Sequence, residues 1–309
     1  MTRAGGARGR ALTAVIGATV LWAGIYVVGD LVVDTVDPIS LTLWRWGLAA
    51  IALLIVAQIV ERPDWRAALR HWPRLLLLGC LGMAGFSVLL LEGLRHTTPV
   101  SGSLIGASGP ILIAVLAALV LRSRIRWRLA LGLAISIVGA ALVVTKGDFA
   151  AVLATGVNIG DLLIVLAYLC WATYVVLGRI VTDVPVITST ALQAVGAAIA
   201  LGIVSCFTGL QLPQDPLGWV GVAYLALLGS ALGFALWAFG LRTLAPATGG
   251  LLMNLMPLWT VLMTLAIGGG IDGWEVAGGL VIIGGVLLGT VPGRRPATRT
   301  MPSLVEPSD

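Results

Sequence analysis

The chain has 309 residues, of which 59% are hydrophobic and only 11% are charged, whereas about 25% of the residues in an ordinary soluble domain carry charge. Together with a mean hydropathy of +1.03, this composition excludes a water-soluble globule. It also excludes disordered, collagen-like and disulfide-rich proteins, because polarity is low, the glycines follow no period and there are three cysteines. The protein is therefore expected to lie in a lipid bilayer.

Ten apolar segments follow one another along the chain, separated by charged or Pro/Gly-rich stretches. Each is close to the roughly 20 residues that a helix needs to cross a bilayer core of about 30 Å. Helices are expected because lipid offers the backbone no hydrogen-bond partners, and because the long apolar runs do not alternate as barrel strands would. The predicted spans are 11–29, 38–60, 75–94, 99–121, 128–146, 159–181, 185–208, 217–240, 246–268 and 273–292.

The first apolar segment follows three arginines and could be taken for a secretory signal peptide. Its length of 19 residues, the presence of Trp22 and Tyr26, and a counterpart later in the chain all favour a permanent span instead.

The basic residues predict how these spans are oriented. With the N-terminus in the cytoplasm, 16 of the 19 Lys and Arg residues fall in cytoplasmic segments, as the positive-inside rule requires. Arg95 and Lys146 fall outside, and Arg45 lies within a span. An even number of spans brings both termini into the cytoplasm. The arginine clusters are interpreted as orientation signals and lipid contacts, so no nucleic-acid partner is expected.

An internal repeat divides the chain into two halves. At an offset of 147 residues, the stretch from Gly93 aligns without a gap with the stretch from Gly240, with eleven identities in 41 positions. We therefore predict a cytoplasmic tail over 1–10, a five-helix repeat over 11–147, a second five-helix repeat over 159–292, and a cytoplasmic tail over 293–309.

Five helices per repeat is an odd number, so the second copy must enter the membrane from the opposite side. Arg95 falls outside and its counterpart Arg242 falls inside, as this inversion requires. Inverted repeats are typical of secondary transporters, in which the substrate binds near midplane between the halves and rocking of the halves alternates access. The fold class expected is thus an all-α membrane protein with ten transmembrane helices in two inverted repeats.

A family resemblance rests on the segments Glu92–Pro110 and Phe239–Pro257, on the Trp-Ala pairs at Trp22 and Trp171, and on Asp161 at the start of the sixth span. These resemble the EamA-type transporters of the drug/metabolite transporter superfamily, over roughly residues 11–292. The resemblance implies a central cavity lined by helices 1 to 4 and 6 to 9, and export of small metabolites, often amino acids. Glu92 departs from the family pattern, which more often has a small residue there.

Two charged residues stand out as functional candidates. Arg45 lies well inside the second span, where a charge costs about 2.5 to 3.5 kcal/mol, so it should face a cavity or a partner. The alternative is a long side chain that reaches the outer headgroups. Glu92 could pair with Arg45, form a surface pair with Arg95, or, if desolvated, carry protons that couple transport.

Further candidates are uncharged. Trp22 and Tyr26 share one helix face, as do Trp171 and Tyr174, and both tryptophans lie near midplane, so they contact either substrate or other helices. Gln193 and Asn254 could bind substrate or join helices. Pro110 and Pro257 are expected at mid-helix, as hinges or static kinks. The predicted substrate-binding residues are Trp22, Tyr26, Arg45, Trp171, Tyr174, Gln193 and Asn254.

Besides Glu92, eight of the acidic residues are expected mainly as solvated charge at the outer face. This group comprises Asp30, Asp34, Asp37, Asp148, Asp161, Asp215, Asp272 and Glu275.

The residue content argues against an enzyme, because the two histidines lie in loops and no metalloprotease or nucleophile-elbow motif occurs. We expect no cofactor and no metal. The predicted function is export of small metabolites such as amino acids across a bacterial cytoplasmic membrane. Efflux of drugs or cationic compounds and a channel-like facilitator are the alternatives. The expected partners are a small-molecule substrate and the lipid bilayer, and a homodimer is left open.

Overall fold

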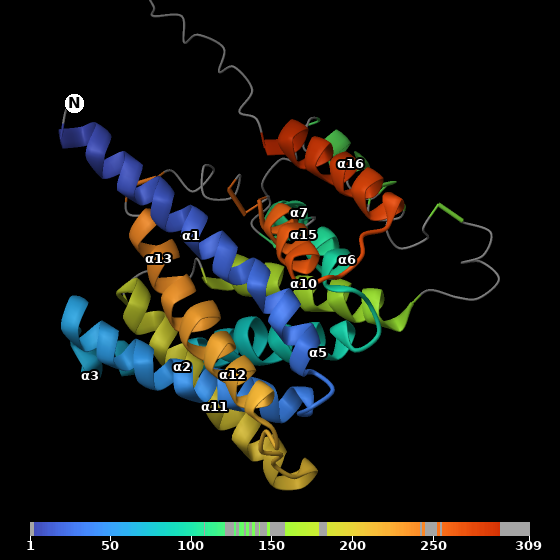
Figure 1. Ribbon diagram of the computed structural model, residues 1–309. Coiled ribbons are helices and arrows are strands. Elements are labelled where there is room, and N and C mark those ends of the chain that lie inside the picture. The colour runs from blue at the N-terminus through green and yellow to red at the C-terminus, as the bar shows by residue number, and fades with distance from the viewer. Residues whose placement is uncertain are drawn as a thin grey trace, which may run out of the picture.

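The computed structural model describes residues 3–107, 109–120, 158–178, 184–241, 243–244, 252–253 and 255–290, with scattered positions from 127 to 148. Within these residues the regular structure is entirely helical (Figure 1). The first half contains α1 (Arg3–Val32), α2 (Pro38–Val60), α3 (Trp65–Leu69), α4 (Trp72–Gly79), η1 (Cys80–Gly85), α5 (Phe86–Leu94), α6 (Pro99–Ala107) and α7 (Gly109–Val120). The second half contains α10 (Ile159–Gly178), α11 (Val186–Thr208), α12 (Pro216–Ala223), η2 (Tyr224–Leu232), α13 (Gly233–Leu241), α15 (Met256–Ala266) and α16 (Gly273–Thr290).

Six continuous helical stretches in the described residues are long and apolar enough to cross a membrane. They are Gly6–Val32, Pro38–Val60, Trp72–Leu94, Ile159–Gly178, Val186–Thr208 and Pro216–Trp237, and they coincide with predicted spans 1, 2, 3, 6, 7 and 8. The apolar helices Met256–Ala266 and Gly273–Gly285 are shorter. Most of the predicted span 128–146 lies outside the described residues, so ten helices remain a prediction.

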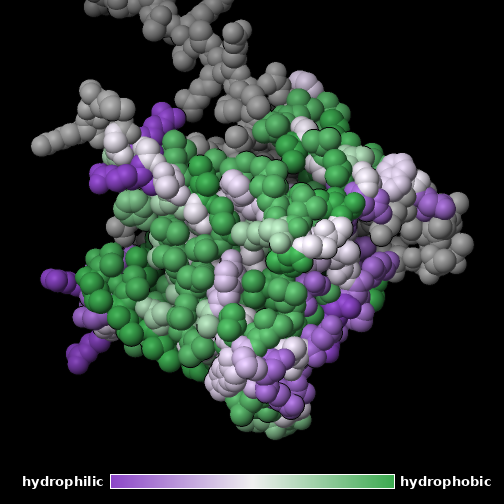
Figure 2. Space-filling model, viewed as in Figure 1, coloured by the Kyte–Doolittle hydropathy of each residue, from purple (hydrophilic) through white to green (hydrophobic). Residues whose placement is uncertain are grey.

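The surface has the character of a membrane protein. Hydrophobic residues cover most of the face in Figure 2, and hydrophilic residues gather at its opposite ends. Large apolar side chains point outward, including Phe207 at 86% exposed and Ile59 at 67%. A soluble protein rarely shows so continuous an apolar surface, so this surface faces lipid.

Polar residues at the helix ends set where the spans begin. Asp37 accepts hydrogen bonds from the backbone N–H groups of Ile39 and Ser40, both at 3.0 Å, and Pro38 follows it. Asp215 accepts one from the N–H of Gly218 at 2.6 Å. A carboxylate that caps a helix N-terminus satisfies N–H groups that have no partner within the helix. Both acidic residues therefore have a structural role at the membrane surface.

The third and the eighth span are each interrupted by a π-helix. η1 lies between α4 and α5, and η2 lies between α12 and α13. Their last residues, Gly85 and Leu232, are 147 residues apart, which is the offset of the internal repeat. π-turns are rare and occur frequently at functional sites. The two halves therefore share a local distortion as well as a sequence pattern.

α2 and α11 come from different halves and are joined at both ends. At one end Glu61 accepts hydrogen bonds from the backbone N–H and the hydroxyl of Thr188, both at 2.8 Å. At the other end the N–H of Gln211 donates to Ser40 Oγ at 2.9 Å, and the N–H of Asp37 donates to Gln211 Oε1 at 3.1 Å. These contacts hold the two helices antiparallel, and we call them the α2–α11 clasps.

Glycines permit two further close crossings at equivalent places. A Cβ on Gly93 of α5 would lie 2.9 Å from the carbonyl oxygen of Gly160 on α10. A Cβ on Gly240 of α13 would lie 3.0 Å from the carbonyl oxygen of Ala11 on α1. Gly93 and Gly240 are also 147 residues apart, so the third helix of each half crosses the first helix of the other half in the same way.

The expected position of one proline is wrong. Pro257 lies in the first turn of α15, whose N-cap is Leu255, and not in the middle of a helix. Proline is tolerated there because an N-terminal N–H has no partner within the helix in any case. Pro110 is the second residue of α7. A hinge function of the two prolines remains a prediction.

Candidate functional site

A cavity of about 50 Å³ lies at the centre of the bundle, where the two halves meet. Its lining residues come from α1, α2, η1, α5, α10 and α13, together with Met253 and Met256 of the predicted ninth span. Relative to the helices implied by the family resemblance, this lining uses spans 1, 2, 3, 6, 8 and 9. Seven aromatic residues form much of its wall: Trp22, Tyr26, Trp46, Phe86, Tyr168, Trp171 and Phe234.

These aromatic rings pack on one another at the interface between the halves. Trp22 of the first half lies 5.5 Å from Phe234, measured between ring centroids, and Trp171 lies 5.3 Å from Phe86. The indole N–H of Trp22 donates to the carbonyl oxygen of Gly229, in η2, at 3.0 Å. Offset and edge-on aromatic pairs stabilise such contacts by about 0.5–1.5 kcal/mol each beyond their burial. The π-helix thus supplies a backbone acceptor to a residue of the cavity wall.

Two tyrosines of this wall come from opposite halves and meet each other. The hydroxyls of Tyr26 on α1 and Tyr168 on α10 are hydrogen-bonded to each other, and both side chains are buried. Gly106 of α6 lies directly behind them, since a Cβ there would lie 2.8 Å from the Tyr26 hydroxyl oxygen. The close approach of α6 therefore requires glycine at this position.

Arg45 is the one charged residue among the described residues that line the cavity, and it is only 2% exposed. Its Nε donates to Ser230 Oγ at 2.8 Å, and its Nη1 donates to Ser87 Oγ at 3.4 Å. The guanidinium carbon lies 5.0 Å from the ring centroid of Trp46, whose own indole N–H donates to Ser87 at 3.0 Å. Among the described residues, no carboxylate lies within 4.0 Å of Arg45.

The structure brings four of the predicted substrate-binding residues together around the cavity, namely Trp22, Tyr26, Arg45 and Trp171. Tyr174 lies one layer behind them, with its ring centroid 5.0 Å from that of Trp171.

The two predicted amide side chains have other positions. Gln193 is buried away from the cavity on α11, and it donates to Ser189 of the same helix at 2.8 Å. Asn254 lies outside the described residues, between Met253 and Met256, which line the cavity.

Sequence reasoning missed several residues of this site. Tyr168 precedes Trp171 by three residues, so helical spacing was a signal that they share a face. Ser87 and Ser230 gave no such signal, because a single serine in an apolar helix becomes a partner of Arg45 only once α2, α5 and η2 are packed. Phe86 and Phe234 are likewise ordinary apolar residues until the halves meet.

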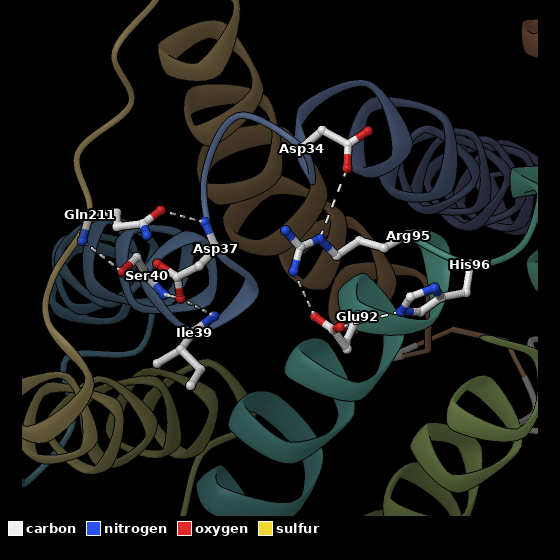
Figure 3. Close-up of polar contacts among 8 residues, drawn as sticks. All are labelled: Asp34, Asp37, Ile39, Ser40, Glu92, Arg95, His96 and Gln211. Atoms are coloured by element: carbon white, nitrogen blue, oxygen red, sulfur yellow. Dashed lines mark hydrogen bonds and ion pairs between the residues drawn. The ribbon is translucent and has the colours of Figure 1, made fainter. Parts of the chain in front are cut away.

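The structure contradicts a pair between Glu92 and Arg45. Glu92 Oε2 lies 3.2 Å from Arg95 Nη1, and Glu92 Oε1 lies 3.5 Å from His96 Nε2. Arg95 also lies 4.0 Å from Asp34, so its guanidinium stands between two carboxylates (Figure 3). Because the Glu92 side chain is 36% exposed, it lacks, in this conformation, the desolvation on which the proton-carrier hypothesis depends. We call this set, Asp34, Glu92, Arg95 and His96, the outer ion-pair network.

The acidic residues of this face are less solvated than expected. A second cavity of about 410 Å³ lies here, between the end of α1, the start of α6 and the start of α10. Asp161 is 5% exposed and accepts a hydrogen bond from the hydroxyl of Thr97 at 2.7 Å. Glu275 is 4% exposed and accepts from the hydroxyls of Thr98 and Ser101 at 2.8 and 3.1 Å. The expectation of free solvated charge is therefore wrong for Asp161 and Glu275, which join α6 to α10 and α16.

The same face holds one of the α2–α11 clasps, and Figure 3 shows Gln211 beside the start of α2. In the part of the chain that the structure describes, no group of three His, Cys, Asp or Glu side chains could hold a metal ion.

Comparison with known proteins agrees with this architecture. The model of the EamA-like transporter family matches the chain twice, over residues 9–145 and 158–291. A protein of known crystal structure superposes with a TM-score of 0.64 at 19% identity, covering 94% of this chain and 100% of its own. At that identity the likeness concerns the fold alone.

Several curated relatives are named as transporters. The uncharacterized transporter YyaM of Bacillus subtilis is 33% identical over 81% of this chain and 84% of its own length. A probable terminal-alkyne amino-acid exporter of Streptantibioticus cattleyicolor is 28% identical over 90% of each chain. The uncharacterized inner membrane transporter YedA of Escherichia coli K12 is 25% identical over 81% of this chain and 80% of its own.

The family and these relatives are transporters, not enzymes. The apolar spans, the lipid-facing surface and the twofold match together identify a multi-pass membrane protein. The chain therefore belongs to the EamA-like transporter family.

Proposed function

We propose that the protein exports small metabolites such as amino acids, by alternating access through the central cavity. The observation that carries this proposal is the position of that cavity. It lies where residues of both halves meet, and it combines an aromatic wall with the buried guanidinium of Arg45. The name of the Streptantibioticus cattleyicolor relative supports an amino-acid-like substrate.

The size of the cavity supports a transport cycle with an opening step. A volume of about 50 Å³ holds only a few water molecules, since one water needs about 10–15 Å³ of such space. A metabolite enters only after the halves have moved apart on one side. Inverted repeats perform such a motion by rocking around a central site, and the paired π-helices η1 and η2 lie beside the site in both halves.

The proposed setting is the cytoplasmic membrane of a bacterium, with both termini in the cytoplasm. This orientation rests on the distribution of arginine and lysine along the chain. The proposed partners are the transported small molecule and the surrounding lipid, with no nucleic acid.

Two other functions compete with this proposal. Efflux of cationic drugs is disfavoured by Arg45, because a buried positive charge repels a cation at close range. A channel-like facilitator would pass its solute without saturation or exchange. Alternating access instead predicts saturation, and acceleration when substrate is present on the opposite side.

The test begins with an overexpressing bacterial strain, whose medium is profiled for excreted amino acids, nucleobases and cationic drugs. Any solute enriched in the medium is then loaded into liposomes that contain the purified protein. The proposal expects saturable uptake that is stimulated by unlabelled solute inside the vesicles. Uptake that stays linear with concentration and shows no stimulation would identify a facilitator.

A further inference from the structure

The guanidinium of Arg45 is buried at the centre of the protein, and the described residues place no counter-charge beside it. It is 2% exposed, and no carboxylate of the described residues lies within 4.0 Å of it. A buried charge is costly unless it is paired, and removing it from water costs several kcal/mol even after relaxation. The two serine hydroxyls compensate only part of this cost, because they carry no net negative charge.

Arg45 also retains hydrogen-bonding capacity. A guanidinium has five N–H donors in a planar fork, and Ser230 and Ser87 account for two of them. Ser87 lies on α5, a helix of the cavity wall, and Ser230 lies on η2, so hydroxyls from two elements hold the side chain in one orientation at the edge of the cavity. The remaining N–H donors of Arg45 belong to a side chain that lines the cavity.

Two structural explanations of Arg45 do not remove the excess charge. Reaching the membrane surface is ruled out by its burial, since a side chain that extends to the headgroups would be exposed at its tip. In the cation–π contact, the ring of Trp46 attracts the guanidinium, but the ring carries no net negative charge. A complementary anion is thus the missing component.

Building on the proposed function, we propose that Arg45 binds the carboxylate of the transported metabolite, and that Ser87 and Ser230 position the guanidinium for it. The apolar part of the metabolite then packs against the aromatic wall formed by residues such as Trp22, Trp171 and Phe234.

A carboxylate fits better than the other anions. It is planar and accepts two parallel hydrogen bonds from a guanidinium, which a single chloride does not. A doubly charged phosphate would leave one negative charge uncompensated, since Arg45 is the one cationic residue in the described lining. The same lining holds no acidic side chain to attract an ammonium group. The site therefore selects carboxylates and rejects amines that lack one.

Three probes with the same phenyl-ethyl body test this selectivity: 3-phenylpropionate, L-phenylalanine and phenethylamine. Binding to the purified full-length protein in detergent is measured by calorimetry. The two acids are expected to bind, and phenethylamine is expected to bind at least about 30-fold more weakly, because losing a charged hydrogen-bonded partner costs 2 kcal/mol or more. Equal binding of phenethylamine, or no binding of either acid, would overturn the proposal.

Variants of the site make the test specific to Arg45. Arg45→Gln is expected to weaken the binding of 3-phenylpropionate by roughly 30-fold or more, and Arg45→Lys to weaken it less. Ser87→Asp places a carboxylate within the chain beside Nη1, and it is expected to block binding while keeping Arg45 buried and the fold intact. Arg66→Gln, which removes an exposed arginine of α3, is the matched control and should bind like the wild type.

The outcomes separate this inference from the proposed function. Unchanged binding of 3-phenylpropionate by folded Ser87→Asp and Arg45→Gln proteins would overturn the role of Arg45, even if the wild type exports some solute. Carboxylate binding that Ser87→Asp abolishes would support the inference, even if the reconstituted protein failed to transport.

Discussion

The two halves of the protein have the same scaffold but different chemistry at the cavity. The π-helices end at equivalent positions, Gly85 and Leu232, and the glycine crossings at Gly93 and Gly240 correspond as well. The position 147 residues after Arg45, however, holds Leu192.

The two serines that hydrogen-bond to Arg45 also have no serine at the equivalent positions of the other half. The counterpart of Ser87 is Phe234, and the counterpart of Ser230 is Met83. The shared features therefore shape helices that pack and move against each other, whereas substrate recognition depends on residues that occur in one half. The predictions that follow test this division between scaffold and recognition.

The largest effect is expected from exchanging the charge between the halves. In Arg45→Leu/Leu192→Arg, the arginine moves to the equivalent place in the second half, where Phe234 and Met83 replace the two serines. We expect about a 100-fold loss of transport rate in liposomes, because a guanidinium without its positioning hydroxyls does not bind the substrate productively. Near-normal transport by this double variant would show that the halves are interchangeable at the cavity.

A smaller effect on stability is expected at the shared glycine crossings. Gly93→Ala and Gly240→Ala should each lower the free energy of unfolding by about 1–3 kcal/mol, because the new methyl group collides with a backbone carbonyl. Thermal unfolding in detergent provides the measurement.

The control for these variants is Gly47→Ala in α2, where a Cβ meets no atom within 4 Å. The two crossings are expected to respond alike. A loss of stability at one crossing but not at the other would contradict the shared scaffold.

Substitution of Trp22 and of Trp171 by phenylalanine should lower stability by modestly different amounts. Trp22→Phe removes the hydrogen bond to Gly229 and should lower stability by about 1 kcal/mol. Trp171→Phe should lower it less, since its indole N–H has no hydrogen-bond partner in the described part of the chain and a phenyl ring keeps its contacts with the neighbouring aromatic rings. Equal losses of stability in the two variants, measured by thermal unfolding, would mean that the hydrogen bond from Trp22 to Gly229 does not stabilise the protein.

The smallest effect is expected outside the cavity, in the outer ion-pair network. Glu92→Gln removes exposed ion pairs with Arg95 and His96, which stabilise a protein by at most about 1 kcal/mol each. Transport and its response to a pH gradient should stay close to those of the wild type. A response that disappears in this variant would restore Glu92 as a proton carrier.

The sequence predicted the scaffold better than the cavity, and the reason is physical. Spans and repeats are encoded locally, in runs of apolar residues and in the charged residues, prolines and glycines that separate these runs. Predicted span boundaries such as 38–60 therefore match α2. The site depends on which faces meet across the interface between the halves. A buried charge is rare enough to be noticed in the sequence, and Arg45 was found in that way.

The sequence left alternatives open where a residue's role depends on distant partners. Gln193 has the polarity of a ligand-binding residue, yet its helix face turns toward α4. Glu92 and Arg45 are both charged and both near the outer half of the membrane. Arg95, however, lies only three residues after Glu92, and Glu92 pairs with it instead of with Arg45. The burial of Asp161 depends on Thr97, 64 residues earlier, and no local pattern shows it.

The α2–α11 clasps have a consequence for how the molecule is held together. Each clasp joins a residue of one half to a residue of the other, with Glu61 on Thr188 at one membrane surface and Gln211 on Ser40 at the opposite one. Neither of these two hydrogen bonds is made by the segment that connects the repeats. Two fragments made as separate polypeptides would thus recognise each other in the bilayer through these helices, and a cut between the repeats would leave an assembled protein.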